Sequence, residues 1–148
     1  MFGTIAASKR IADLDSIEQT QQELLRMAGQ AASSGECAAA AEIFECGIEH
    51  FARSFALAGE YATFLHSAQD KTFRDIPRSV ELARRAVKQS SRRVSSLLTL
   101  AAALGAAGDY SEATAVAEEV IKKSPPQYYR KKALDLKSRL VQERNTRD

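Results

Sequence analysis

The chain has 148 residues, of which 45% are apolar and three are proline, and its formal net charge is +2. This length can bury one hydrophobic core without disulfides, so the two cysteines need not pair, and we expect a reducing compartment, the cytoplasm. The sequence contains no apolar run of the roughly 18 residues that a membrane-spanning helix needs, so we expect no membrane association. Alternating strand patterns are also missing, which predicts an all-α protein.

The two ends of the chain are expected to lie outside the folded domain. Residues 1–15 are expected to form a partly disordered tail, and their composition only faintly resembles a targeting segment. A single domain is expected over residues 16–144. Residues 145–148 are expected to fray.

The stretch Gly108–Ala113 separates two amphipathic helical patterns and is the most informative part of the sequence. Gly108 can adopt the left-handed conformation that ends a helix. Asp109 and Glu112 have the spacing of a capping box, which predicts the start of the next helix. The sequence therefore predicts an antiparallel helical hairpin here.

The same hairpin recurs along the chain at a regular spacing. In the first helix of each hairpin, apolar or small residues repeat after 34 and then 39 positions: Leu24, Ala28 and Ala31; Ala58, Ala62 and Leu65; Leu97, Ala101 and Leu104. In the second helix they repeat after 39 and then 34 positions: Ala40, Phe44, Gly47 and Ile48; Ser79, Ala83, Ala86 and Val87; Ala113, Ala117, Val120 and Ile121. The extra five residues therefore fall within 67–78, where Asp70, Asp75 and Pro77 favour a turn and a helix start.

At these positions the chain resembles the tetratricopeptide repeat family, which has a period of about 34 residues. That family places small residues where two helices cross, then a glycine, an aromatic residue, an alanine and a closing proline. The third repeat matches best, and its matching residues are Ala101, Leu104, Gly108, Tyr110, Ala113 and Pro125. The resemblance implies an α-α superhelix of three hairpins at about 21–52, 55–91 and 94–125, followed by a capping helix over 125–144. Ser124 is predicted to be the N-cap of that last helix.

In this family the first helices line a concave groove that binds a peptide or a helix, and the resemblance implies the same use here. The implied groove residues are Gln22, Leu25, Arg26, Gly29, Ala32 and Ser33 in the first repeat; Ala56, Gly59, Glu60, Thr63, His66 and Ser67 in the second; and Ser95, Leu98, Thr99, Ala102, Gly105 and Ala106 in the third. Gly29, Gly59 and Gly105 are expected either to let a partner backbone approach closely or to have no function.

The sequence therefore favours a non-catalytic protein-protein interaction module, an adaptor whose partner it does not identify. No catalytic, cofactor-binding or metal-binding residue is indicated, because His50 and His66 are the only histidines and neither lies in a recognisable motif. The alternatives are a secretion-type chaperone that holds an extended client segment and a nucleic-acid binder. A basic cluster, Arg84, Arg85, Lys88, Arg92 and Arg93, suggests the latter, but no aromatic residues are interleaved with it for base stacking.

The charges are distributed unevenly between the two halves of the chain. Residues 1–70 contain four Lys or Arg and ten Asp or Glu, whereas residues 71–148 contain seventeen and nine. Such an asymmetry favours head-to-tail contact at low salt. We predict a monomer with at most weak self-association.

Overall fold

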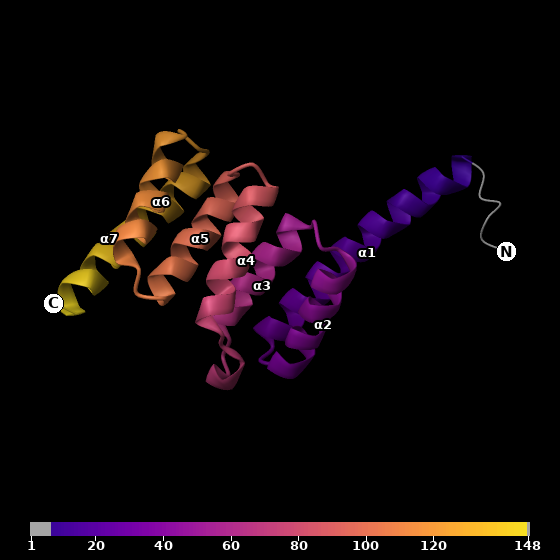
Figure 1. The fold of residues 1–148 in the computed structure, drawn as a ribbon, viewed down its shortest axis with the longest axis horizontal. Helices are drawn as coiled ribbons and strands as arrows, with labels where there is room; N and C mark the ends of the chain where they lie inside the picture. The colour runs from indigo at the N-terminus through magenta and orange to yellow at the C-terminus, as the bar shows by residue number, and fades with distance from the viewer. Residues whose placement is uncertain (1–6, 148) are drawn as a thin grey trace.

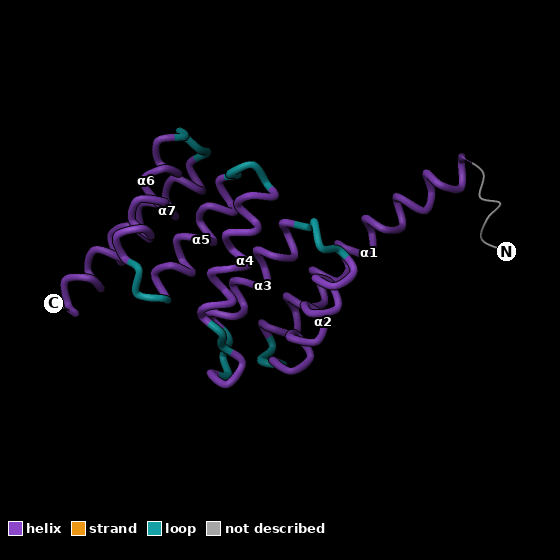
Figure 2. Tube along the Cα trace, in the orientation of Figure 1, coloured by secondary structure: helices purple, strands orange, loops and turns teal. Residues whose placement is uncertain are grey.

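A computed structural model of the chain describes residues 7–147. Over these residues it contains seven α-helices, one short 3₁₀ helix and no strand (Figures 1 and 2). The elements are α1 (Ala7–Ser33), α2 (Cys37–His50), α3 (Phe55–Ser67), η1 (Lys71–Phe73), α4 (Ile76–Gln89), α5 (Val94–Ala106), α6 (Tyr110–Lys122) and α7 (Gln127–Arg147). The predicted fold class, all-α with seven helices, is confirmed over this range.

The helices form two layers. Each helix packs against the next one along the chain, and α1, α3, α5 and α7 also contact one another in that order. These four helices form one layer, and α2, α4 and α6 pack against them in the other, so that successive hairpins lie side by side (Figure 1).

The first helix is longer than the sequence predicts. It begins at Ala7, ahead of the expected domain boundary at residue 16, and its N-terminal part projects beyond the other helices (Figure 1). Residues 7–15 therefore have a helical backbone, which corrects the expectation of a tail up to residue 15. Residues 1–6 lie outside the described part of the chain.

Most of the repeating positions are buried, as the register read from the sequence predicts, and Leu24, Ile48 and Ile121 are partly buried. In the layer of first helices, Ala28, Ala62 and Ala101 are each 0% exposed. The same holds for Ala40 and its equivalents Ser79 and Ala113 in the second helices. Small residues at equivalent places allow the helices of each hairpin to approach closely, and the larger apolar side chains fill the space around these crossings.

Two hairpin turns are built in the same way. Gly35 and Gly108 have φ values of +78° and +85°. After Gly108, the N–H of Asp109 donates to the carbonyl of Leu104 at 2.9 Å, and the N–H of Glu36 donates to the carbonyl of Ala31 at the same distance. These bonds satisfy terminal helix carbonyls in the Schellman pattern, as Gly108 predicts.

The middle hairpin contains the predicted insertion. The chain leaves α3 at Ser67, forms η1, and enters α4 at Ile76. The carboxylate of Asp70 accepts from the Thr72 N–H at 3.0 Å, and that of Asp75 accepts from the Arg78 N–H at 3.1 Å. Both aspartates thus begin helical turns, as the sequence predicts.

Three details at helix ends differ from the predictions. The capping box of Asp109 and Glu112 does not form, because the Asp109 side chain makes no capping bond and Glu112 pairs with Arg84. Ser124 was predicted to be the N-cap of a helix that starts at residue 125. Instead Ser124 has a φ of +50°, and α7 begins only at Gln127. Pro126 accounts for this shift, because the residue before a proline is disfavoured in the α conformation, which makes Pro125 a poor first residue of the helix.

The C-terminal end of α7 is also more ordered than expected. The helix continues to Arg147, so fraying from Asn145 is not seen over residues 145–147. The guanidinium of Arg147 lies 5.5 Å from the centre of the Tyr110 ring, a contact that holds the end of α7 near α6.

Candidate protein-binding surface

The layer formed by α1, α3, α5 and α7 has a hollowed outer surface, which we call the odd-helix face. Four neighbouring hollows of about 730, 470, 300 and 230 Å³ lie on it. They share residues with one another, since Glu60 lines three of them and Thr63, His66, Ser95, Thr99 and Ala102 each line two. The hollows therefore form one connected surface across the four helices.

The predicted groove residues lie on this face with one exception. Leu25, Arg26, Ala56, Gly59, Ser95 and Thr99 line the hollow between α1, α3 and α5. Gly29, Ala32, Ser33, Thr63 and Ser67 line the next hollow, and His66, Ala102, Gly105 and Ala106 line the one near the end of α5. Leu98 lies in the largest hollow with Glu60. Gln22 is exposed and lines none of them.

One whole wall of the largest hollow was not predicted from the sequence. There α5 forms the floor, α3 forms one wall, and α7 forms the other. The α7 residues are Tyr128, Tyr129, Lys132, Asp135, Leu136 and Arg139. Steps of four, three and four residues from Tyr128 to Arg139 define one helical face. The spacing is present in the sequence, but this segment was predicted only to be a capping helix.

The three glycines of the predicted groove have different surroundings. A Cβ atom on Gly29 would meet nothing within 4 Å, and one on Gly59 would only touch the Ala86 Cβ at 4.0 Å. Gly105 is buried, and a Cβ atom there would lie 2.5 Å from Leu140 Cδ2. Gly105 is thus a packing requirement of α7, which corrects its expected role as an open groove wall, while Gly29 and Gly59 leave free space on the surface.

The charges on this face are few and mostly at its edges. Arg26 forms an ion pair with Glu23 at 2.5 Å on the same helix. Glu60 forms no ion pair with any described residue. On the α7 wall, the Lys132 ammonium lies 4.7 Å from the centre of the Tyr128 ring. Two carboxylates of this face therefore form no ion pair with a described residue: Glu60 on α3, and Asp135 on α7, which lies between the cations Lys132 and Arg139.

His66 is a titratable group that lies partly buried in two of the hollows. Its Nε2 atom is buried and has no hydrogen-bond partner among the described residues. Burial lowers the pKa of His66, and the nearby cations Arg139 and Arg74 lower it further. The imidazole is therefore neutral at physiological pH. His50, by contrast, lies near the end of α2, with its Nδ1 atom 2.9 Å from the carbonyl oxygen of Cys46.

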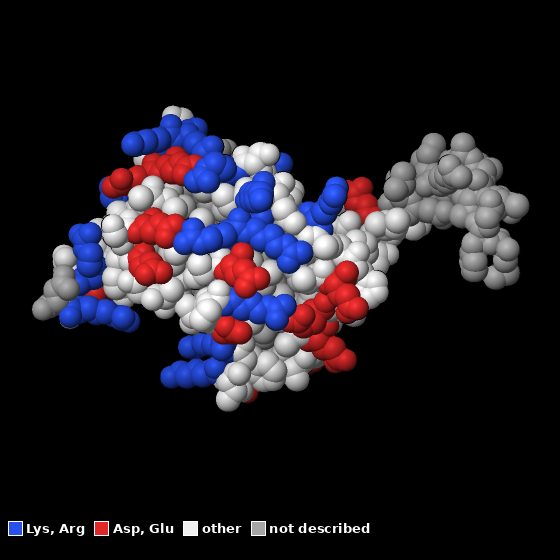
Figure 3. Space-filling model, in the orientation of Figure 1, with Lys and Arg blue, Asp and Glu red and all other residues white. Residues whose placement is uncertain are grey.

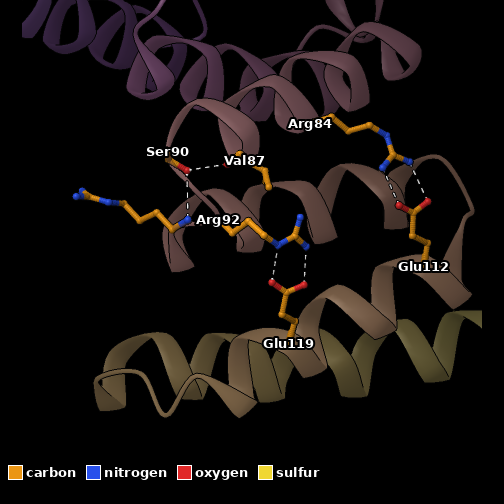
Figure 4. A network of polar contacts seen from close by, with 7 residues as sticks. Arg84, Val87, Ser90, Arg92, Glu112 and Glu119 are labelled. Carbon is orange, nitrogen blue, oxygen red and sulfur yellow. Dashed lines mark hydrogen bonds and ion pairs between the residues drawn. The ribbon is translucent and has the colours of Figure 1, made fainter.

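Two of the five cations of the basic cluster on α4 and the following turn, Arg84 and Arg92, are paired with acids of α6. Arg84 forms two hydrogen bonds to Glu112, at 2.7 and 2.8 Å, and Arg92 forms two to Glu119, at 2.8 and 2.6 Å (Figure 4). In the face shown, acidic and basic side chains lie next to one another over these helices (Figure 3). A surface that binds phosphates needs cations free to displace counterions, so the pairing of Arg84 and Arg92 weakens the nucleic-acid alternative.

A second hollow lies apart from the odd-helix face, beside the insertion. It has a volume of about 480 Å³ and is lined by residues of α2, α3 and the segment 72–78. The Tyr61 hydroxyl donates to Glu45 at 2.6 Å, and Arg78 pairs with the same carboxylate at 2.9 Å. These contacts join α2, α3 and α4, and they give the residues near this hollow a structural role.

Comparisons of the chain with models of protein families, with curated proteins and with solved structures find no match. Within residues 7–147, no helix combines the length and apolar character needed to cross a membrane. No cluster of three or more His, Cys, Asp or Glu placed to hold a metal ion occurs in the same range.

Proposed function

We propose that this chain is a non-catalytic protein-interaction module of the tetratricopeptide repeat type, which binds a peptide or helix of a partner protein on the odd-helix face. The observation that carries the proposal is the connected series of hollows along α1, α3, α5 and α7. Small residues line much of it, and Gly29 and Gly59 leave space that no side chain of this chain fills. Such a surface lets a helix or an extended backbone approach closely.

Two further features support the repeat assignment and the compartment. The buried positions follow the 34- and 39-residue spacing, and Gly35 and Gly108 end equivalent helices in the same conformation. Cys37 and Cys46 are free thiols, which fits the proposed location in the reducing cytoplasm.

The proposal is tested by affinity capture with variants that fill the surface. Gly59→Leu places a side chain in the hollow between α1, α3 and α5 without a clash at its Cβ, so the domain should fold and lose its partners. Ala115→Leu is the matched control, because it adds the same side chain at an exposed position of α6 that lines no hollow.

Proteins that bind the wild type and Ala115→Leu but not Gly59→Leu, identified by mass spectrometry, would support the proposal. Circular dichroism of each variant verifies that the helices remain. Capture that is equal for all three proteins would show that binding does not use this face.

A further inference from the structure

The largest hollow on the odd-helix face has walls of unlike charge. Its floor is α5, and the segment Val94–Ala106 contains no charged residue. Ser95, Thr99 and Ala102 lie along this floor at steps of four and three residues, with Leu98 beside them. The floor is therefore a row of small side chains next to one apolar contact, and the charges belong to the walls.

One wall carries a single acid. Glu60 of α3 is exposed, and three of the four hollows include it. No described cation pairs with it. The other titratable group on this wall, His66, is partly buried and contributes no positive charge at neutral pH because burial lowers its pKa. The Glu60 carboxylate is therefore available to pair with a cation of a partner protein.

The opposite wall carries two cations with one acid between them. Lys132, Asp135 and Arg139 lie on the face of α7 that lines the hollow. Lys132 forms no ion pair with a described residue, and Arg139 has only a long one, with its Nε 3.9 Å from Glu143. Seven residues separate the two cations, which is two helical turns or about 10.5 Å along the axis.

We infer that the occupant of this hollow is an amphipathic helix of a partner protein whose two flanks have opposite charges. The apolar face of this helix lies on α5, between Leu98 of α5 and Leu136 of α7. On one flank of the helix, a Lys or Arg faces Glu60. On the other flank, two carboxylates seven residues apart face Lys132 and Arg139. This inference rests on the proposed function and specifies the partner for the same surface.

The spacing of the charges favours a helix over an extended segment. In a helix that lies along α5, residues seven apart are about 10.5 Å apart and point to the same side. In an extended segment the same distance corresponds to about three residues, whose side chains point to alternating sides. Only the helical partner can therefore direct two carboxylates at the α7 wall and keep its apolar face on the floor.

The test is a selection with displayed helical peptides of about 20 residues, long enough to form helix on binding. One face of each peptide is fixed as alanine and leucine, and Lys, Glu or Gln is allowed at the flank positions. A helix can lie in the hollow in either direction. The result is therefore scored by whether the two flanks of a peptide carry opposite charges, and either flank may carry the Lys. We expect enrichment of peptides with Lys on one flank and two Glu seven residues apart on the other.

Charge-reversed variants of the chain test the same assignment independently. With Glu60→Lys, the best mixed-charge peptide should bind about tenfold more weakly, and peptides with Glu on both flanks should become preferred. With Lys132→Glu and Arg139→Glu together, peptides with Lys on both flanks should become preferred. Glu81→Lys and Lys122→Glu, exposed positions that line no hollow, serve as controls and should leave the ranking unchanged.

The possible outcomes separate this inference from the proposed function. The inference would be overturned if the enriched peptides had uncharged flanks or flanks of a single sign. It would also be overturned if the charge-reversed variants did not alter the ranking of the peptides. Either result would leave the odd-helix face as a binding surface. No enrichment of any peptide over a selection without the protein would overturn both.

Discussion

Leu140 of α7 lies directly over Gly105 of α5, so closely that a Cβ atom at position 105 would be 2.5 Å from Leu140 Cδ2. Leu140 is only 1% exposed, so the surrounding core leaves it little room to move away. The missing side chain of Gly105 is therefore what allows α7 to pack against α5. This packing also fixes the α7 wall of the largest hollow.

Gly105→Ala should destabilise the protein for this reason. Overpacking of a well-filled core costs about 1–3 kcal/mol, whereas replacing a helix glycine by alanine gains about 1 kcal/mol. We expect a net loss in the free energy of unfolding of about 1 kcal/mol, measured by urea denaturation.

Gly29→Ala is the matched control for that substitution. Gly29 also lies within a helix, but an added Cβ would meet nothing within 4 Å. Here only the gain in helix propensity remains, so the free energy of unfolding should rise by about 0.5–1 kcal/mol. If both variants were equally stabilised, Leu140 would not be held against Gly105.

The contrast between these glycines shows where sequence reasoning stops. The repeat register was predictable because small and apolar residues must recur wherever helices cross, so Ala62 and Ala101 reveal their burial by position alone. The surroundings of a glycine depend on which distant side chain covers it, and nothing near Gly105 in the sequence indicates Leu140. The α7 wall was missed for a related reason, since Lys132 and Arg139 resemble an ordinary solvated helix face until the packing of α7 on α5 places them at the hollow.

Helix ends were predictable only where one residue decides the conformation. Gly108 ended its helix as expected because the left-handed conformation favours glycine, and Gly35 ends α1 in the same conformation. The capping box at Asp109 failed because Glu112 has a competing partner, Arg84, from another helix. Such competition is not visible in a local pattern.

Tyr61→Phe tests the contact that joins α2 to α3. The hydroxyl of Tyr61 donates to Glu45 at 2.6 Å, and its ring stacks on Phe44 with centres 5.1 Å apart. Phenylalanine keeps the ring contact and removes the hydrogen bond, so the free energy of unfolding at neutral pH should fall by about 1 kcal/mol. Urea denaturation of both proteins measures the difference.

The same pair predicts a dependence on alkaline pH. Burial raises the pKa of Tyr61, and the hydrogen bond to Glu45 raises it further. The unfolded tyrosine loses its proton near pH 10, before the folded one does, so the advantage of the wild type is complete below about pH 10 and shrinks above it. A wild-type advantage over Tyr61→Phe that stayed constant through this range would contradict the assigned shift.

His66 predicts a dependence on acidic pH with the opposite direction. Burial lowers its pKa, so the unfolded chain takes up a proton at a pH where the folded chain does not. The stability that the neutral His66 contributes is present above about pH 6.5 and decreases as the pH falls below it. In His66→Gln this component should be missing, so the difference in unfolding free energy between the two proteins should change between about pH 7.5 and 5. A constant difference would show that His66 titrates as in the unfolded chain.

The final prediction concerns self-association. The uneven charges favour salt-dependent contact between chains, whereas α7 could supply an apolar interface that salt does not affect. Ala133 and Leu140 of α7 are buried in their own chain and are therefore not available to a neighbour. Association would also have to offset the loss of translational and rotational freedom, and salt screens the attraction between the acidic and basic halves. We expect a monomer in sedimentation experiments at physiological salt and at most weak dimers at low ionic strength.

A stable dimer that salt does not affect would instead indicate an apolar interface. Leu134, which is 44% exposed on α7, would then be the first position to change, and Leu134→Glu would test its part in the interface.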